Sequence, residues 1–156
     1  MATFNTTIQG SSTGDTLIGT KADQLITGGS SADSLGSKYS SSCLVGAGGA
    51  DTFYTNKTVD GVGTGNTLTG GTGSDSFGFG THGATSVAIF GNQDNDTVNL
   101  TGAFINSSAY GGKSEDSLRF AATVSNAYIE ANSGNDTIDV TAPLKASTIH
   151  AGAGDD

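Results

Sequence analysis

The sequence predicts an all-β fold, a parallel β-solenoid of about seven coils that stack on one another. Its clearest sign is an aspartate that recurs in phase with glycine-rich turns. A second sign is that apolar residues recur at two fixed places between these aspartates. The 25 glycines among 156 residues, and the alternation of apolar with polar residues, argue against helices. The recurring aspartates are Asp15, Asp33, Asp51, Asp75, Asp96, Asp116, Asp136 and Asp156.

The intervals between these aspartates give the coil length, 18–24 residues. In chain order they are 18, 18, 24, 21, 20, 20 and 20 residues. Each repeat is too short to bury its own apolar face, so neighbouring coils must stack to build a core. We therefore expect one domain over residues 1–156, with incomplete end coils at 1–9 and 151–156. The complete coils are Gly10–Thr27, Gly28–Val45, Gly46–Thr69, Gly70–Phe90, Gly91–Tyr110, Gly111–Glu130 and Ala131–His150.

Each coil is expected to hold two short strands, which build two sheets back to back. The first strand follows the aspartate, and its buried position is Leu17, Leu35, Phe53, Phe77, Val98, Leu118 and Ile138. The second strand ends the coil, with Ile26, Leu44, Leu68, Ile89, Ala109, Ile129 and Ile149 in the equivalent place. From the fourth coil a middle row is expected to close the second turn: Ala84, Phe104, Val124 and Leu144. Apolar residues at all these places predict a thin interior between two sheets.

The composition limits the classes of partner. Six Lys and Arg against 15 Asp and Glu give a net charge of −9, which argues against nucleic acid and favours cations. No apolar run is long enough to span a bilayer, so membrane insertion is not expected. Cys43 is the one cysteine, so no intrachain disulfide can stabilise the fold, and a metal is the candidate for that role.

The aspartates themselves predict the metal. A carboxylate stacked on a copy of itself in every coil would repel its neighbours, and a hard divalent cation between the coils removes that repulsion. Glycines in the preceding turns allow positive φ angles, which can turn backbone carbonyl groups toward the same cation. We therefore expect several Ca²⁺ ions, with the eight aspartates as their ligands. The competing explanation, that Gly-Asp turns only solvate loops, does not account for their phase with two apolar rows.

The turn sequences resemble a known repeat. Examples are GAGGAD at Gly46–Asp51, GGTGSD at Gly70–Asp75 and AGAGDD at Ala151–Asp156. They are similar to the nonapeptide G-G-x-G-x-D-x-U-x, where U is apolar, of the RTX (repeat-in-toxin) family, and the resemblance covers about residues 10–156. It implies a calcium-filled parallel β-roll. In that fold each ion would be held by carbonyl groups and aspartates of two adjacent turns.

The chain departs from the RTX pattern in two ways. The opposite edge of the coil carries Gln24, Ser42, Asn66, Val87, Ser107, Ala127 and Ser147 at the place equivalent to the aspartate. Only Asn66 resembles a ligand there, so we expect one calcium-binding edge and a packed turn opposite. In addition, the glycine at the fourth position of the turn is replaced in four turns, by Thr13, Ser31, Asp94 and Ser114. Asp94 could add an oxygen ligand.

No pattern of catalytic residues is present, so an enzyme is not expected. The histidines, His82 and His150, lie in different coils, and no G-x-S-x-G or HExxH motif occurs. Solvent-facing histidines are the simpler explanation. Cys43 is expected to be packed or partly exposed rather than catalytic.

The sequence favours a calcium-dependent structural protein, a self-assembling extracellular scaffold such as a surface layer, filament or matrix. It resembles bacterial surface-layer and matrix proteins of the RTX family in being repeats throughout. The open ends of a solenoid can template pairing, so head-to-tail stacking into a homo-oligomer is expected. The stretch Met1–Gly10 lacks the features of a cleaved signal peptide, which agrees with type I secretion to the cell surface or beyond.

A second interpretation keeps the calcium but changes the role. The chain would be a calcium-triggered repeat module of a larger type I-secreted toxin, hydrolase or adhesin. In that case the coils would fold only on leaving the low-calcium cytoplasm.

Overall fold

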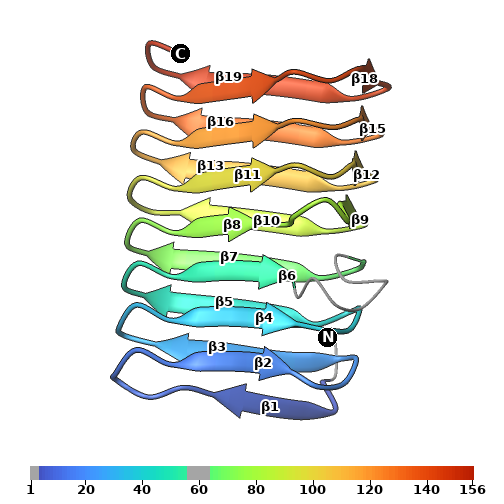
Figure 1. Cartoon of the computed structure of the whole chain (residues 1–156). Coiled ribbons are helices and arrows are strands. Elements are labelled where there is room, and N and C mark those ends of the chain that lie inside the picture. Colours follow the sequence, from blue (N-terminus) through green and yellow to red (C-terminus); the bar gives the residue numbers. More distant parts are fainter. Residues whose placement is uncertain (1–3, 56–63) are drawn as a thin grey trace.

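The computed structural model describes residues 4–55 and 64–156, and these wind into a parallel β-solenoid (Figure 1). The described residues form strands and turns without any helix, so no helix among them could cross a membrane. The predicted fold class is confirmed. Residues 1–3 of the first half-coil and 56–63 of the coil Gly46–Thr69 lie outside the described residues.

Two large sheets face each other, and a smaller one joins them. Sheet A consists of β1 (Thr6–Gln9), β3 (Gln24–Gly29), β5 (Cys43–Gly48), β7 (Thr67–Thr72), β10 (Ala88–Asn92), β13 (Ser108–Lys113), β16 (Tyr128–Ser133) and β19 (Thr148–Ala153), in that order. Sheet B consists of β2 (Thr16–Gly19), β4 (Ser34–Ser37), β6 (Thr52–Thr55), β8 (Ser76–Gly78), β11 (Thr97–Leu100), β14 (Ser117–Phe120) and β17 (Thr137–Val140). Sheet C consists of β9 (Ala84–Thr85), β12 (Phe104–Ile105), β15 (Val124–Ser125) and β18 (Leu144–Lys145).

Sheet C is a difference from the prediction of two sheets. The middle row of apolar residues does more than close a turn, because Ala84, Phe104, Val124 and Leu144 each begin a two-residue strand. Phe104 pairs with Ala84 on one side and Val124 on the other. From the fourth coil onward the chain therefore passes through three strands per coil.

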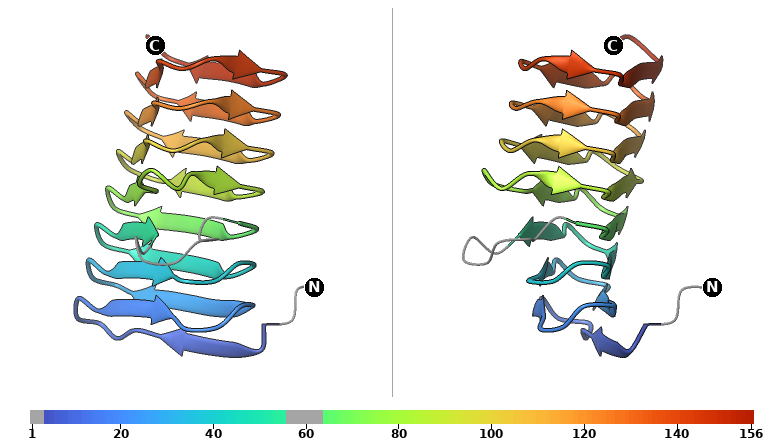
Figure 2. Two further views of the ribbon diagram at one scale, coloured as in Figure 1. Left: turned by 45° about the vertical axis from the view of Figure 1, so that its right-hand side comes forward. Right: turned by 90° about the vertical axis from the view of Figure 1, so that its right-hand side faces the viewer.

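The strands pair in parallel, with equivalent residues of successive coils side by side. Ile8 lies beside Ile26, Val98 beside Phe77 and Leu118, and Ile129 beside Ile149. Figure 2 shows the result in two further views, in which the coils lie on one another as parallel layers. This register turns each position of the repeat into a row along the solenoid axis, so one residue type can stack on itself from coil to coil.

The core is the narrow space between the sheets, as predicted. Phe53 and Phe77 stack there with ring centroids 4.6 Å apart, and both are fully buried. Leu17 and Ile138, at the two ends of their row, are only half-buried. In the same last coil, Leu144 of sheet C and Ile149 of sheet A are 48% and 36% exposed, since no described coil covers them. Burial in this fold therefore depends on the next coil.

Candidate metal centre

The eight recurring aspartates lie in the turns that lead from sheet A into sheet B, at the left edge of Figure 1. Each aspartate from Asp15 to Asp136 directly precedes a strand of sheet B, so the strand fixes its position. We call this row the aspartate ladder. Asp15 is half-buried, Asp156 is exposed, and the side chains between them are buried: Asp33, Asp51, Asp75, Asp96, Asp116 and Asp136.

Hydrogen bonds join each aspartate to the next. The backbone N–H of Asp75 donates to Oδ1 of Asp96 at 2.8 Å, and the carbonyl oxygen of Asp75 accepts from the N–H of Thr97 at 2.8 Å. The same N–H to Oδ1 bond joins every successive pair from Asp15–Asp33 to Asp136–Asp156, at 2.7–3.0 Å. The ladder thus fastens coil to coil through one carboxylate oxygen, a contact that the sequence did not predict.

The second carboxylate oxygen divides the ladder into two classes. In the first two turns it accepts a backbone N–H, from Ser11 to Asp15 at 2.6 Å and from Gly29 to Asp33 at 2.7 Å. Further along, the buried Oδ2 atoms have no hydrogen-bond partner among the described residues; they belong to Asp51, Asp75, Asp96, Asp116 and Asp136. A buried carboxylate oxygen without a partner is costly, so each of these atoms favours either a proton or a bound cation.

The backbone conformation of the turn accounts for the two classes. From the third turn on, the second and fourth turn residues have positive φ, as in Ala47 at +86° and Gly49 at +94°. None of the residues in the turns 10–15 and 28–33 has a positive φ. Gly29, which donates its N–H to Asp33, corresponds to Ala47 in the next turn, where the altered backbone makes no such bond. Of the predicted ligands, Asp15 and Asp33 therefore occupy a different kind of turn.

The first glycine of the turn lets the aspartate Oδ2 approach the backbone closely, beside a carbonyl oxygen of the next coil. A Cβ atom added to Gly70 would lie 2.8 Å from the carbonyl oxygen of Gly91 and would collide with Oδ2 of Asp75. The same pair of oxygens borders the equivalent position at Gly28, Gly46, Gly91 and Gly111, so the pair occurs in both classes of turn, and the later turns differ in that their Oδ2 has no partner among the described residues. A carboxylate and a carbonyl oxygen of the next coil are the donors that Ca²⁺ prefers. The residues present therefore fit a hard cation at these turns.

The seventh coil offers less room. Ala131 takes the place of the first glycine, and it is fully buried. Its methyl group lies where the glycines at the other turns carry no side chain. Of the later aspartates, Asp136 is thus the least suited to a cation.

Burial raises the pKa of the ladder aspartates. It raises the pKa of Asp75 and Asp96 to about 7 and that of Asp51 and Asp116 to about 6, with Coulombic repulsion from neighbouring aspartates adding to the effect. The backbone N–H bond to each carboxylate opposes this rise. Without a metal, protonation of Oδ2 removes the buried charge. Proton and cation therefore compete for the same oxygen.

Aspartates alone do not complete a coordination shell. Among the described residues, no group of three His, Cys, Asp or Glu side chains is placed to hold a metal ion. Ca²⁺ takes six to eight oxygens, so backbone carbonyls and water would have to supply the remainder. Asp94, predicted as an extra ligand, is exposed and accepts a hydrogen bond from the N–H of Gly73 at 2.8 Å.

The opposite edge of the coil carries a neutral version of the ladder. The N–H of Ser42 donates to Oδ1 of Asn66 at 2.8 Å, and the N–H of Val87 donates to Oγ of Ser107 at 3.0 Å. Ser147 accepts from Ala127 in the same way at 3.1 Å. The same type of hydrogen bond, from a backbone N–H to a side-chain oxygen of the next coil, therefore occurs at both edges. The acceptors at this edge are neutral and need no counter-ion.

The remaining reactive side chains lie apart from the aspartate ladder. His82 and His150 are exposed, as predicted. Cys43 is half-buried on β5, and burial raises the pKa of its thiol. Comparison with known proteins found no matching family model, no similar curated protein and no similar solved structure.

Proposed function

We propose that this chain is a non-enzymatic, calcium-dependent structural protein that assembles outside the cell, as the resemblance of its turns to RTX repeats implies. The observation that carries the proposal is the row of buried Oδ2 atoms without partners from Asp51 to Asp136. Each needs a positive charge or a proton. A divalent cation at these turns would hold two coils together and make folding depend on calcium.

Self-assembly would use the ends of the solenoid. In the last described coil Leu144 and Ile149 are exposed, whereas the equivalent Val124 and Ile129 one coil earlier are fully buried. A groove of about 360 Å³ lies here, lined by Ile138, Val140 and Ile149 together with Asp136 and Asp156. The edge strands β17, β18 and β19 offer backbone groups for pairing in the same place. A further coil from a second copy, stacked head to tail, would cover this surface.

The same exposed surface also favours the alternative. A further coil of one longer polypeptide would cover Leu144 and Ile149 equally well. The chain would then be a calcium-triggered repeat module of a larger type I-secreted toxin, hydrolase or adhesin. Export without a cleaved N-terminal signal belongs to both versions of the proposal.

A calcium titration tests the metal, and the size of the particles distinguishes the two roles. Circular dichroism and sedimentation velocity would be measured on the full chain in EGTA, in Mg²⁺ and in increasing Ca²⁺. We expect Ca²⁺, but not Mg²⁺, to increase β-structure or thermal stability, and to produce particles larger than a monomer. A fold indifferent to EGTA would overturn the calcium dependence. A monomer that folds with calcium and does not assemble would favour the repeat module.

A further inference from the structure

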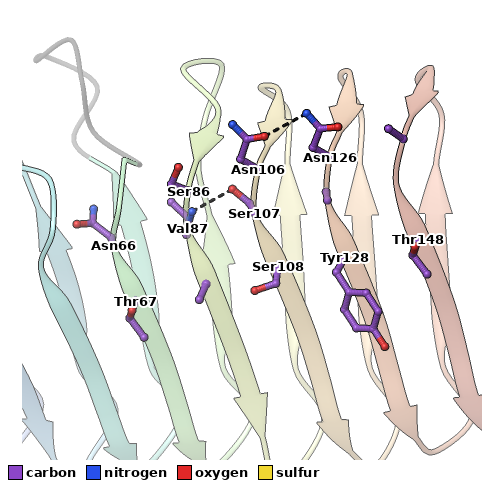
Figure 3. A pocket seen from close by; sticks show the side chains of 13 residues that line it. Asn66, Thr67, Ser86, Val87, Asn106, Ser107, Ser108, Asn126, Tyr128 and Thr148 are labelled. Atoms are coloured by element: carbon purple, nitrogen blue, oxygen red, sulfur yellow. Dashed lines mark hydrogen bonds between the residues drawn. The ribbon is translucent and has the colours of Figure 1, made fainter. Parts of the chain in front are cut away.

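A shallow groove runs along the solenoid axis at the corner between sheet C and sheet A (Figure 3). It has a volume of about 660 Å³ and extends from Asn66 to Thr148, across the strands β7, β10, β13, β16 and β19. We call it the corner groove. It lies on the outer surface, away from the aspartate ladder, because its residues precede or begin the strands of sheet A.

The corner itself is built from residues in the left-handed region. Ser86, Asn106, Asn126 and Ala146 occupy one place in successive coils, with φ between +46° and +56°. Asparagine tolerates this conformation better than most residues. The bend leaves the side chains of Asn106 and Asn126 exposed at the rim of the groove, as Figure 3 shows.

The two asparagines form an oriented polar pair. Nδ2 of Asn126 donates to Oδ1 of Asn106 at 3.2 Å. This bond fixes which way both amides face. It leaves the amide nitrogen of Asn106 and the amide oxygen of Asn126 without another partner among the described residues. The pair thus presents one free donor and one free acceptor at its opposite ends, and the hydroxyl groups of a sugar can bond to either kind of group.

An aromatic side chain stands on the floor of the groove. The corresponding residues of the two preceding coils are Ala88 and Ser108, which are small, and then Tyr128 rises from β16 (Figure 3). Its ring is held between those of Tyr110 and His150, with centroids 5.7 and 5.6 Å away. Its hydroxyl group donates to Glu130 at 3.0 Å. A ring restrained in this way offers apolar surface at little entropic cost.

The charge of the groove selects the class of ligand. All of its lining residues are uncharged, although the chain carries a net charge of −9. A polyanion would be repelled by the protein and would find no cation in the groove. An extended peptide gains nothing from the sheet here, because the groove crosses strands whose backbone groups already pair between coils.

The spacing of the lining residues along the solenoid axis also suits a sugar polymer. Equivalent lining residues recur once per coil, at the strand spacing of about 4.8 Å. A neutral, β-linked hexose polymer advances by a similar distance per sugar, so one sugar can lie over each coil, with two successive sugars over Asn106 and Asn126. We propose that the corner groove binds a neutral β-linked glycan chain along the solenoid axis, through the Asn106–Asn126 pair and the ring of Tyr128.

Affinity electrophoresis of the full chain tests this proposal. Native gels would contain hydroxyethyl cellulose, a neutral glucan, or polygalacturonate, a polyanion, and calorimetry with cellohexaose would give the affinity. We expect the neutral glucan to slow the protein and the polyanion not to. Equal mobility in all gels, with no heat on adding cellohexaose, would overturn the proposal, as would stronger retention by the polyanion.

Variants locate the site. The double substitution Asn106→Gly and Asn126→Gly keeps the positive φ and removes both amides, so affinity should fall about tenfold, as the loss of neutral hydrogen bonds predicts. Asn99→Ala, at an exposed position on sheet B, is the matched control and should bind normally. Ser108→Gln, which fills the floor without touching the pair, should weaken binding as well. Unchanged affinity in a folded double variant, or in Ser108→Gln, would overturn the assignment.

Discussion

The backbone N–H of Asp75 donates a 2.8 Å hydrogen bond to Oδ1 of Asp96, while Oδ2 of Asp96 is buried without a partner among the described residues. One carboxylate therefore has two tasks. Its first oxygen joins two coils, and its second requires a proton or a cation. Any change in the charge of Asp96 must alter both the stability of the stack and its affinity for metal.

The raised pKa values predict that the calcium-free protein loses stability as the pH rises. An aspartate in the unfolded chain titrates near a pKa of about 3.9, whereas that of folded Asp96 is about 7. Between these values the folded state binds more protons, so the free energy of unfolding falls with pH. The stabilisation is complete below about pH 4 and is lost as the pH rises through about 7.

Urea denaturation in EGTA between pH 4 and 8 checks this dependence. Saturating Ca²⁺ should reduce the fall in the free energy of unfolding near neutral pH, because the cation takes the place of the proton on Oδ2. A stability in EGTA that rises steadily over this range would contradict the protonated ladder.

Asparagine substitutions should have opposite effects in the two classes of turn. In Asp96→Asn the amide can still accept from the N–H of Asp75, and a neutral group replaces the buried carboxylate oxygen that has no partner among the described residues. Without calcium we expect a gain of about 1 kcal/mol in unfolding free energy. Calcium should no longer increase the unfolding free energy through this turn.

Asp33→Asn is the matched comparison. Both of its carboxylate oxygens accept backbone N–H groups, from Asp15 and from Gly29. An amide nitrogen must then face one of these donors, so we expect a loss of about 1–3 kcal/mol. Urea denaturation of both variants in EGTA measures the difference, and the reverse order of stability would contradict the division into two classes.

The two oxygens that lie against Gly70 predict that a larger residue there would weaken calcium binding. Gly70→Ala places a methyl group against Asp75 Oδ2 and the carbonyl oxygen of Gly91. We expect fewer bound Ca²⁺ ions by calorimetry and a destabilisation of about 1–3 kcal/mol from overpacking. Gly78→Ala is the control, since an added Cβ there meets nothing within 4 Å. Equal calcium binding by the two variants would contradict a cation at this position.

The exposed apolar residues of the last coil predict the assembly surface. Leu144→Gln combined with Ile149→Gln removes apolar area that another coil would bury. In calcium, the weight-average mass from sedimentation equilibrium should fall toward that of a monomer. Asn99→Gln, on an exposed side face, should leave it unchanged. Assembly unaffected by the double substitution would exclude stacking through this end.

The apolar rows were predictable because the repeat places them in every coil. Phe53, Phe77 and Leu118 lie in the core as expected, since one in-phase apolar residue per strand has no other place to be buried. Sheet C was not predicted as a sheet, because a strand such as Phe104–Ile105 is too short to show alternation.

The two classes of aspartate turn were harder to predict. Asp94 and Ser114 keep the positive φ of the glycines that they replace, whereas Thr13 and Ser31 do not. Residue type at the fourth position therefore does not decide the conformation by itself. The hydrogen bonds of the aspartate ladder depend on the stacking of whole coils, which no single repeat reveals.

The aspartate ladder also has a direction. Every backbone N–H in it donates toward the C-terminal neighbour, from Asp15 to Asp33 and onward to Asp156. Each coil consequently shows amide hydrogens on its C-terminal side and carboxylate oxygens on its N-terminal side. Two solenoids that met through the same end would bring donor against donor or carboxylate against carboxylate. Copies that join end to end through the aspartate ladder must therefore all point the same way, and the two ends of a fibre made from them would differ.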